Sequence, residues 1–271
     1  MNNLLKLLPP PFIRAVGRLQ FEFPILRKPI NFLGQRLAGK GVIQHGAGRG
    51  LRFDARGCNP GYLAGTSEPR EQELILRYST PGMVVYDLGA NAGFYALIAG
   101  RAVGPTGKVY AFEPTPWLAA RARSNAAINA LDNVEVIEAA ISQLDGTVGF
   151  QVGESHVNNA IRNETGPIDQ NVITVKSFRL DTFAAGRRPP NLLLIDIEGA
   201  EIEALESGLE TISRHRPIMM VEVHWLGTRF IDFFERALAP FGYVASTYDG
   251  KSLCPDPVRY HALLVPKEAA S

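Results

Sequence analysis

From residue 84 onward, short apolar runs alternate with longer segments in which apolar residues recur at helical spacing. The apolar runs predict buried strands at 84–88, 109–113, 134–139, 192–197 and 218–223, and two further runs predict closing strands at 243–247 and 262–266. The segments between them predict helices at 92–102, 116–131, 201–212 and 229–238. Because strands and helices alternate, we expect an α/β fold with a mostly parallel sheet and helices on both of its faces.

Three segments depart from this alternation. Residues 41–55 have the pattern of a hairpin, and residues 68–78 have that of a helix. Between the third and fourth strands, 147–152 and 172–178 predict a hairpin-like excursion, which is either functional or a tolerated surface insertion. We therefore divide the chain into an extension, 1–40, and a single domain, 41–271, with a pre-domain hairpin and helix at 41–80 and the insertion at 144–180.

Composition and charge limit the possible functions of this chain more than they limit its possible folds. The formal net charge is +1, so nothing indicates a nucleic-acid partner. Cys58 and Cys254 have no metal-binding spacing and fit a reducing compartment, so we expect a cytoplasmic protein. Residues 1–40 are basic and apolar, and either pack on the domain or make a weak contact with a membrane surface. No run is apolar enough to span a bilayer, and no feature predicts an oligomeric state.

The end of the first predicted strand carries the most informative motif. The strand ends in Asp87 and leads into a turn with the spacing G-x-N-x-G, formed by Gly89, Asn91 and Gly93. Glycines let the chain turn tightly and let a ligand approach the backbone. The spacing differs from the G-x-G-x-x-G of dinucleotide-binding turns, and it indicates a different adenosine-containing cofactor, S-adenosylmethionine (SAM).

Polar groups follow each of the five predicted parallel strands. The strands end in Asp87, in Glu113, in the segment 138–142, in Asp196 with Glu198, and in Glu222 with His224. In an open parallel sheet these ends meet at one edge, where ligands bind. The sequence therefore predicts a cofactor enzyme with its site at this edge.

The motifs at these strand ends resemble the FkbM family of SAM-dependent methyltransferases. The matching segments lie at 85–93, 112–114, 180–183, 195–201 and 222–224, with 65–68 resembling an element that precedes the domain, so that the resemblance covers residues 41–266. It implies a Rossmann-like class I methyltransferase fold, in which a seven-stranded, mostly parallel sheet ends in an antiparallel strand. It also implies O-methyl transfer to a hydroxyl of a sugar, a glycan or a secondary metabolite.

The resemblance assigns roles to residues along this edge. Glu113 would hold the ribose of SAM, 89–93 the ribose and methionine, 138–142 the adenine, and Asp196 would lie nearest the sulfonium. The expected cofactor-binding residues are Asp87, Gly89, Ala90, Asn91, Gly93, Phe94, Glu113, Ala139, Ser142 and Asp196. For the acceptor we expect Glu68, Glu222 and Asn158, together with the insertion at 146–178.

The acceptor chemistry calls for a proton acceptor, because an alcohol is a weak nucleophile until it loses its proton. His224 is our candidate base, since its ordinary pKa lies near neutrality, with Asp196 and Glu198 orienting it or holding the acceptor. We assign no metal, although Asp196, Glu198, Glu222 and His224 together could bind a divalent ion. Glu201 and Glu203 are expected on a solvated helix face.

Other interpretations of these strand-end residues remain open. His224 could be a hydrogen-bonded residue at a strand end with no catalytic role, and Glu222 its structural partner. The whole chain could be a non-catalytic SAM- or nucleotide-binding module, or an NAD-dependent oxidoreductase, against which the spacing of the glycine turn argues.

Overall fold

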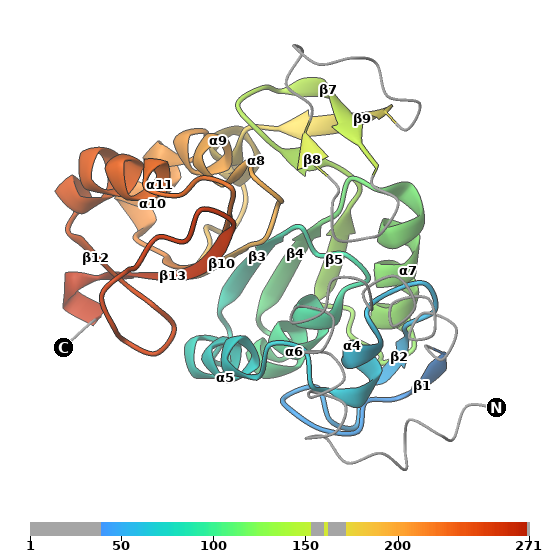
Figure 1. The fold of residues 1–271 in the computed structure, drawn as a ribbon. Helices are drawn as coiled ribbons and strands as arrows, with labels where there is room; N and C mark the ends of the chain where they lie inside the picture. The colour runs from blue at the N-terminus through green and yellow to red at the C-terminus, as the bar shows by residue number, and fades with distance from the viewer. Residues whose placement is uncertain (1–38, 153–159, 162–171, 270–271) are drawn as a thin grey trace, which may run out of the picture.

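The computed structural model describes residues 39–152, 160–161 and 172–269, and its centre is a seven-stranded sheet (Figure 1). The strand order across the sheet is β12-β13-β11-β10-β3-β4-β5. These strands are β3 (Val84–Leu88), β4 (Lys108–Phe112), β5 (Val134–Ile137), β10 (Leu192–Ile195), β11 (Ile218–His224), β12 (Tyr243–Ser246) and β13 (Arg259–Pro266). Each strand predicted for the sheet is present, and the α/β expectation is confirmed.

Strand β13 is the one that breaks the parallel arrangement. It pairs antiparallel with β11 on one side, where Glu222 lies opposite His261 and His224 opposite Arg259, and antiparallel with β12 on the other. The pairings of β3 with β4 and β10, of β4 with β5, and of β10 with β11 are parallel. The carboxyl ends of the five parallel strands therefore meet at one edge, as the site prediction requires.

Helices cover both faces of the sheet (Figure 1). On one face lie α5 (Pro69–Tyr78), α6 (Phe94–Val103) and α7 (Pro116–Ala127), and on the other α8 (Leu180–Ala184), α9 (Glu201–Glu206), α10 (Leu209–His215) and α11 (Arg229–Phe233). Successive strand residues point to opposite faces. Accordingly, Val85 packs with Leu74 and Leu97 in one buried cluster, and its neighbour Tyr86 packs with Phe230 in the other.

The connection between β5 and β10 forms a separate small sheet. Its strands are β6 (Ala140–Ile141), β7 (Gly146–Gln151), β8 (Ala160–Ile161) and β9 (Val172–Phe178), in the order β6-β9-β7-β8. The predicted hairpin is present, because β7 and β9 pair antiparallel. Strand β6 follows β5 closely along the chain and pairs with β9. The small sheet therefore lies next to the cofactor edge of the large sheet (Figure 1).

Helical boundaries differ from the predictions at three places. The sequence prediction missed α4 (Pro60–Ala64) and α8. The helix predicted at 201–212 is two helices, α9 and α10, which meet at Gly208, where a Cβ atom would lie 2.3 Å from the side chain of Leu180. After α11 the chain continues as a π-helical turn, Phe234–Leu238, and a 3-10 turn, Ala239–Phe241, and a last 3-10 turn follows β13 at Lys267–Ala269.

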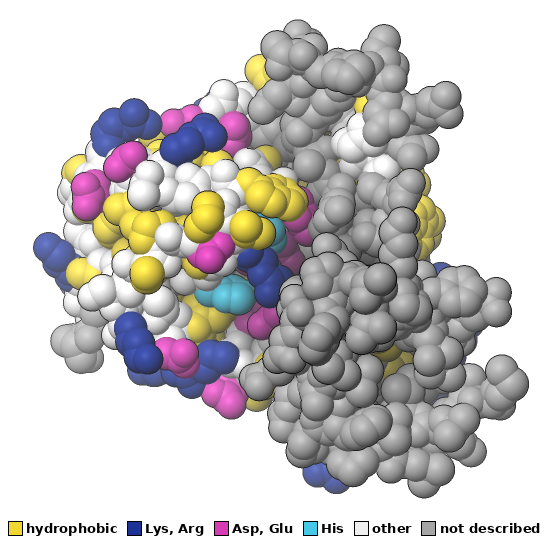
Figure 2. Space-filling model, in the orientation of Figure 1, with side chains coloured by type: hydrophobic (Ala, Val, Ile, Leu, Met, Phe, Trp, Pro, Cys, Tyr) yellow, Lys and Arg dark blue, Asp and Glu magenta, His cyan; other side chains and the backbone are white. Residues whose placement is uncertain are grey.

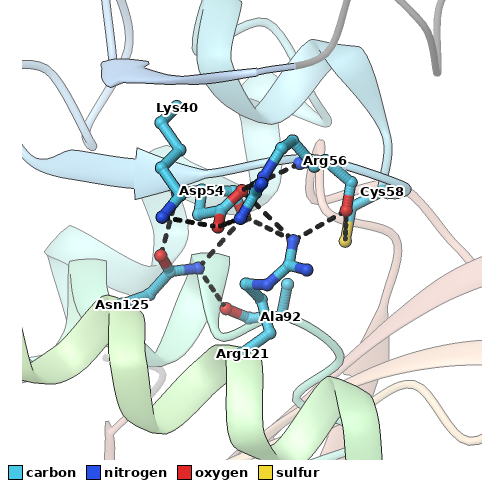
Figure 3. Close-up of polar contacts among 7 residues, drawn as sticks. All are labelled: Lys40, Asp54, Arg56, Cys58, Ala92, Arg121 and Asn125. Atoms are coloured by element: carbon cyan, nitrogen blue, oxygen red, sulfur yellow. Dashed lines mark hydrogen bonds and ion pairs between the residues drawn. The ribbon is translucent and has the colours of Figure 1, made fainter.

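A hairpin of β1 (Lys40–Val42) and β2 (Arg52–Asp54) precedes these layers and is anchored to α7 (Figure 3). The side chain of Asn125 on α7 accepts the backbone N–H of Asp54 at 2.8 Å and donates to the carbonyl of Ala92 at 3.0 Å. The Asp54 carboxylate also pairs with Arg56 at 2.7 Å and Arg121 at 3.2 Å. Among the described residues, no helix is both long and apolar enough to cross a membrane.

Candidate active site

The glycine turn between β3 and α6 lies against the end of β10. Gly89 has φ of +91°, and a Cβ atom there would lie 1.9 Å from the carbonyl oxygen of Asp196. Only glycine therefore allows the end of β3 to approach the end of β10 so closely. The N–H groups of Gly89 and Ala90 donate to the carbonyl of Phe112, which ties the turn to β4 as well.

Glu113, just past β4, organises the other side of this turn. Its two carboxylate oxygens accept the backbone N–H groups of Asn91 at 2.9 Å and Thr115 at 2.8 Å. The side chain is buried, and burial, opposed by these bonds, raises the pKa of Glu113 to about 7. Each carboxylate oxygen has a second lone pair, so Glu113 keeps acceptor capacity for a ligand.

A cavity of about 810 Å³, including its open mouth, lies between the turn, β4 and the small sheet. Seven of the ten expected cofactor residues line it, namely Gly89, Ala90, Asn91, Phe94, Glu113, Ala139 and Asp196. The segment 138–142, expected at the adenine, also contributes Ala140 and Ile141. The sequence prediction gave no cofactor role to Tyr62, Tyr95, Phe112, Pro114, Phe150 and Ile197, and it named Glu198 only for catalysis. Phe112, Pro114 and Ile197 lie inside the motif segments 112–114 and 195–201, whereas no motif marks Tyr62, Tyr95 or Phe150.

Three expected cofactor residues do not line the cavity. Ser142 bonds with Ser177 through their hydroxyls at 2.6 Å, so it joins the small sheet together. Gly93 caps α6 with φ of +89°. Asp87 is buried behind the turn, where one carboxylate oxygen has no hydrogen-bond partner among the described residues, and burial and the charge of Glu113 raise its pKa to about 7.

The cavity suits SAM on the evidence of its lining. Glu113 offers a buried carboxylate that can accept hydroxyl groups, as a ribose requires. Phe112, Ile141 and Phe150 provide apolar surface for a flat purine ring. Asp196 and Glu198 also line the cavity, and negative groups suit the cationic end of SAM.

Beside this cavity, His224 at the end of β11 is surrounded by carboxylates. Its Nδ1 lies 2.9 Å from an oxygen of Glu201, and its Nε2 lies 3.4 Å from Glu222 and 3.8 Å from both Asp196 and Glu198. The first of these contacts is a correction, because Glu201 was expected in solvent and is instead fully buried at the start of α9. The remaining three confirm that the ends of β10 and β11 come together.

These surroundings make His224 a cation. Burial alone would lower its pKa, but the bonds to Glu201 and Glu222 and the charges of Asp196 and Glu198 outweigh burial and raise the pKa of His224 to about 11. The histidine is therefore an imidazolium at neutral pH, not the near-neutral imidazole that the sequence suggested. The physical reason is that it faces four carboxylates, of which the sequence analysis named Asp196, Glu198 and Glu222 as neighbours and placed Glu201 in solvent.

The acids around His224 differ in their protonation. Burial, opposed by the charge of His224, raises the pKa of Glu198 to about 7. Burial and the charge of Glu222 raise the pKa of Asp196, whose side chain is 39% exposed, so water screens part of this effect. Burial also acts to raise the pKa of Glu222, but His224 at 3.4 Å, His261 at 3.8 Å and Arg259 at 2.8 Å outweigh it and hold this pKa far below its ordinary value.

The acceptor-side residues form a chain of charges that leads away from His224. Arg259 of β13 lies 2.8 Å from Glu222 and 3.7 Å from Glu68, which begins α5 with φ of +38°. Figure 2 shows acidic, basic and histidine side chains close together near the middle of this face. Glu68 and Glu222 are thus brought to one place, and Asn158 lies outside the described residues. The sequence analysis missed Arg259, which no strand-end argument could find.

Asp196, Glu198 and His224 are also the described group with the spacing for a metal ion. One ligand atom from each lies within 4.8 Å of the others. A histidine must be neutral to bind a metal, so binding would have to displace the proton on His224. The geometry alone does not favour a metal over the imidazolium that the acids already enclose.

The seven-stranded sheet with its antiparallel β13, and the cavity at the carboxyl ends of the parallel strands, match the class I methyltransferase fold and the SAM site expected from the sequence. A profile of the methyltransferase FkbM domain matches residues 87–244, which is more than half of the chain. The chain therefore belongs to the FkbM family of methyltransferases, and the resemblance noted in the sequence is confirmed.

Individual relatives are more distant. The chain is 27% identical over 161 residues to 2-O-methyltransferase NoeI of Sinorhizobium fredii, a match that spans 54% of this chain and 65% of the relative. It is 27% identical over 153 residues to hexuronic acid methyltransferase AglP of Haloferax volcanii, spanning 56% and 60%. The chain thus spans less than two thirds of either relative. The crystal structure of methyltransferase FkbM from Methylobacillus flagellatus is similar at 16% identity and a TM-score of 0.46, over 76% of this chain and 53% of that one.

Proposed function

We propose that this chain transfers the methyl group of SAM to a hydroxyl oxygen of a sugar, a glycan or a related metabolite. The names of NoeI and AglP describe a 2-O-methyltransferase and a methyltransferase acting on a hexuronic acid, which supports an oxygen acceptor of this kind. The acid-rich wall next to the cofactor cavity supports it independently, because carboxylates bind hydroxyl groups well.

The observation that carries the proposal is the position of Glu198. Its carboxylate lines the cofactor cavity, lies 3.8 Å from His224, and has a pKa of about 7. A general base works best when its pKa lies near the operating pH. We therefore exchange the roles expected from the sequence, so that Glu198 takes the proton of the acceptor hydroxyl and His224 positions it.

The remaining groups support this proton transfer. Bound SAM supplies a methyl group already activated by its sulfonium, so the protein must chiefly orient the acceptor and exclude water. Glu201 holds the imidazolium of His224 in place. The positive charge of His224 lowers the pKa of Glu198 and so favours the ionised carboxylate. Glu222 is held ionised by His224, His261 and Arg259, and can accept a second hydroxyl of the acceptor.

We also propose that Glu68 and the described strands β7 and β9 of the segment 146–178 border the acceptor entrance, and that the protein acts in the cytoplasm. Residues 153–159 and 162–171 of this segment lie outside the described residues. Glu68 supports the first point through its contact with Arg259. The free thiol of the buried Cys58 is consistent with a reducing compartment.

Methyl transfer from labelled SAM to a panel of methyl hexopyranosides and hexuronosides tests the proposal. We expect label in at least one glycoside, and isothermal titration should give heat with SAM and none with NAD. At saturating SAM, Glu198→Gln should lower kcat by roughly 10²- to 10⁴-fold, a loss separate from any change in SAM affinity, because Glu198 also lines the cofactor cavity. Glu206→Gln, a partly exposed acid at the end of α9 whose side chain is 33% exposed, is the control and should behave as the parent. Label only in an amine or in no acceptor would reject the proposal, and full activity of Glu198→Gln would reject its proton acceptor.

A further inference from the structure

Trp225 is a large apolar side chain that is exposed directly beside the proposed reaction centre. It follows His224 at the end of β11, its indole is 52% exposed, and its ring centroid lies 5.5 Å from that of His224. A single exposed apolar residue is ordinary on a protein surface. The position of Trp225 is what distinguishes it, because its neighbours are the residues that surround the acceptor hydroxyl in the proposed function.

The indole is supported from beneath by the loop that carries Glu198. A Cβ atom on Gly199 would lie 3.5 Å from the Cε3 atom and 3.9 Å from the Cζ3 atom of Trp225, which is ordinary van der Waals contact. The ring therefore rests over the backbone next to Glu198, and more than half of its surface stays open to solvent. The indole therefore combines a packed contact with a large area open to solvent.

The backbone holds the indole in this position at some cost. Trp225 has φ of +53°, a conformation that bulky residues rarely adopt. Its N–H donates to the carbonyl of Val258 at 2.9 Å, and the hydroxyl of Tyr260 donates to the carbonyl of Gly227 two residues later at 2.8 Å. Two bonds to β13 and the segment before it thus fix a conformation that would not persist by itself.

We propose that Trp225 is the stacking platform for the acceptor sugar, binding the apolar C–H face of a pyranose ring on its exposed side. This inference rests on the proposed function and adds the part of the acceptor that is recognised. An indole presents a rigid apolar surface with a negative π face, and ring C–H groups of a pyranose carry partial positive charge. A ring stacked here lies next to the loop of Asp196 and Glu198, so that a hydroxyl at its edge reaches the Glu198 carboxylate.

Tryptophan fluorescence tests this platform directly, since the chain contains two tryptophans, Trp117 and Trp225. Trp117→Phe leaves Trp225 as the sole reporter, and Trp225→Phe leaves Trp117, on α7, as the matched control. With SAM present, methyl β-D-glucopyranoside, whose ring hydrogens are axial on both faces, should change the emission of Trp117→Phe saturably. Glycerol, which has hydroxyls and no ring face, should not. No saturable change, or an equal change in both variants, would overturn the inference.

Steady-state kinetics with a glycoside that the parent protein methylates provide the second test. Trp225→Ala should raise the KM for the acceptor roughly tenfold, with the Kd for SAM unchanged as evidence of folding. Trp225→Phe should restore most of the loss, and Trp225→Leu, which keeps apolar bulk without a π face, should not. If Trp225→Ala leaves the acceptor KM unchanged, the stacking role of Trp225 is overturned and the proposed function is not. If the parent protein methylates no glycoside, the proposed function fails, and the fluorescence result then decides the platform by itself.

Discussion

At the scale of single residues, the carboxylate of Glu113 does two structural tasks with one side chain. It accepts the N–H of Asn91 in the glycine turn and that of Thr115 at the start of α7, and it lines the cofactor cavity. Because both oxygens are engaged, a change of one oxygen to an amide affects both the fold and the ligand.

We expect Glu113→Gln to weaken SAM binding by at least about tenfold and to lower the free energy of unfolding by ~1–3 kcal/mol. The new NH2 group would face one of two backbone N–H donors, so one of these loses its acceptor. Isothermal titration and thermal unfolding measure the two effects. Glu135→Gln, an exposed acid paired with Lys108, is the control, and equal behaviour of the two variants would contradict the role of Glu113.

The pH dependence of turnover depends on Glu198. Its pKa of about 7 lies above the ordinary value of 4.5, so the carboxylate gains its charge only as the pH rises through 7. We expect kcat at saturating substrates to rise with pH and to level off above an inflection near 7. His224 lowers this pKa, so His224→Asn should move the inflection to higher pH. A pH–rate profile with the same inflection in both proteins would show that a different group titrates.

The stability of the protein should also depend on the protonation of His224. Its pKa is raised in the folded state from 6.5 to about 11, so its stabilising contribution is complete below pH 6.5 and is lost as the pH rises toward 11. This range could not be predicted from the sequence, because it depends on Glu201, which the chain brings to His224 from the start of α9. The sequence analysis placed Glu201 in solvent because helical periodicity does not show which residues of a short helix face a site.

At the scale of elements, the attachment of the β1–β2 hairpin to α7 rests on two asparagines one turn apart. Asn125 and Asn129 each bond the backbone of one β2 residue, Asp54 and Arg52 respectively, through both amide atoms. Asn125 is fully buried and its contacts have no access to water, whereas the bonds of Asn129 to Arg52 are exposed. The same geometry therefore occurs in two environments.

Burial should decide the cost of losing these bonds. Asn125→Ala leaves buried backbone groups of Asp54 and Ala92 without partners, and we expect a loss of ~2–4 kcal/mol. Asn129→Ala exposes its partners to water and should cost roughly 0.5–1.5 kcal/mol. Denaturant titration of both variants measures the difference. Equal losses would mean that the hairpin is held chiefly by the ion pairs of Asp54 and not by these amides.

Close contact between β3 and β10 can be tested with a pair of glycines. Gly89 and Gly104 both have positive φ, but only Gly89 has a backbone atom, the carbonyl oxygen of Asp196, in the place of a Cβ. Gly104→Ala should cost about 1 kcal/mol through backbone strain alone. Gly89→Ala should cost more and should also abolish SAM binding, as measured by titration. Retained SAM affinity in Gly89→Ala would show that the two strand ends can separate without harm.

Element by element, the sequence predicted the sheet well and the small additions poorly. Strands such as β3 and β10 are almost wholly apolar, with an acid at or just after the strand end (Asp87 and Asp196), which is a strong local signal. Helices α4 and α8 have five residues each, too few for helical spacing to appear. The aromatic lining of the cavity, such as Tyr62 and Phe150, comes from α4 and β7, so its place depends on packing between distant segments.

At the scale of the whole molecule, charge at the site offers a test of metal dependence. The imidazolium of His224 lies where a cation would bind, among Asp196, Glu198 and Glu222. We therefore expect methyl transfer to continue unchanged in excess EDTA and to gain nothing from added Mg²⁺ or Mn²⁺. Loss of activity in EDTA that Mg²⁺ restores in the parent protein, and not in Asp196→Asn, would instead show a bound metal.

The antiparallel strand β13 has a consequence for how the protein is made. It lies between β11 and β12, so β12 has no place in the sheet until residues 259–266 have left the ribosome. The same strand supplies Arg259 and His261, which hold Glu222 ionised. During synthesis the cofactor half of the edge can therefore form well before the acceptor half, and the nascent chain can bind its methyl donor before it has a complete place for the molecule to be methylated.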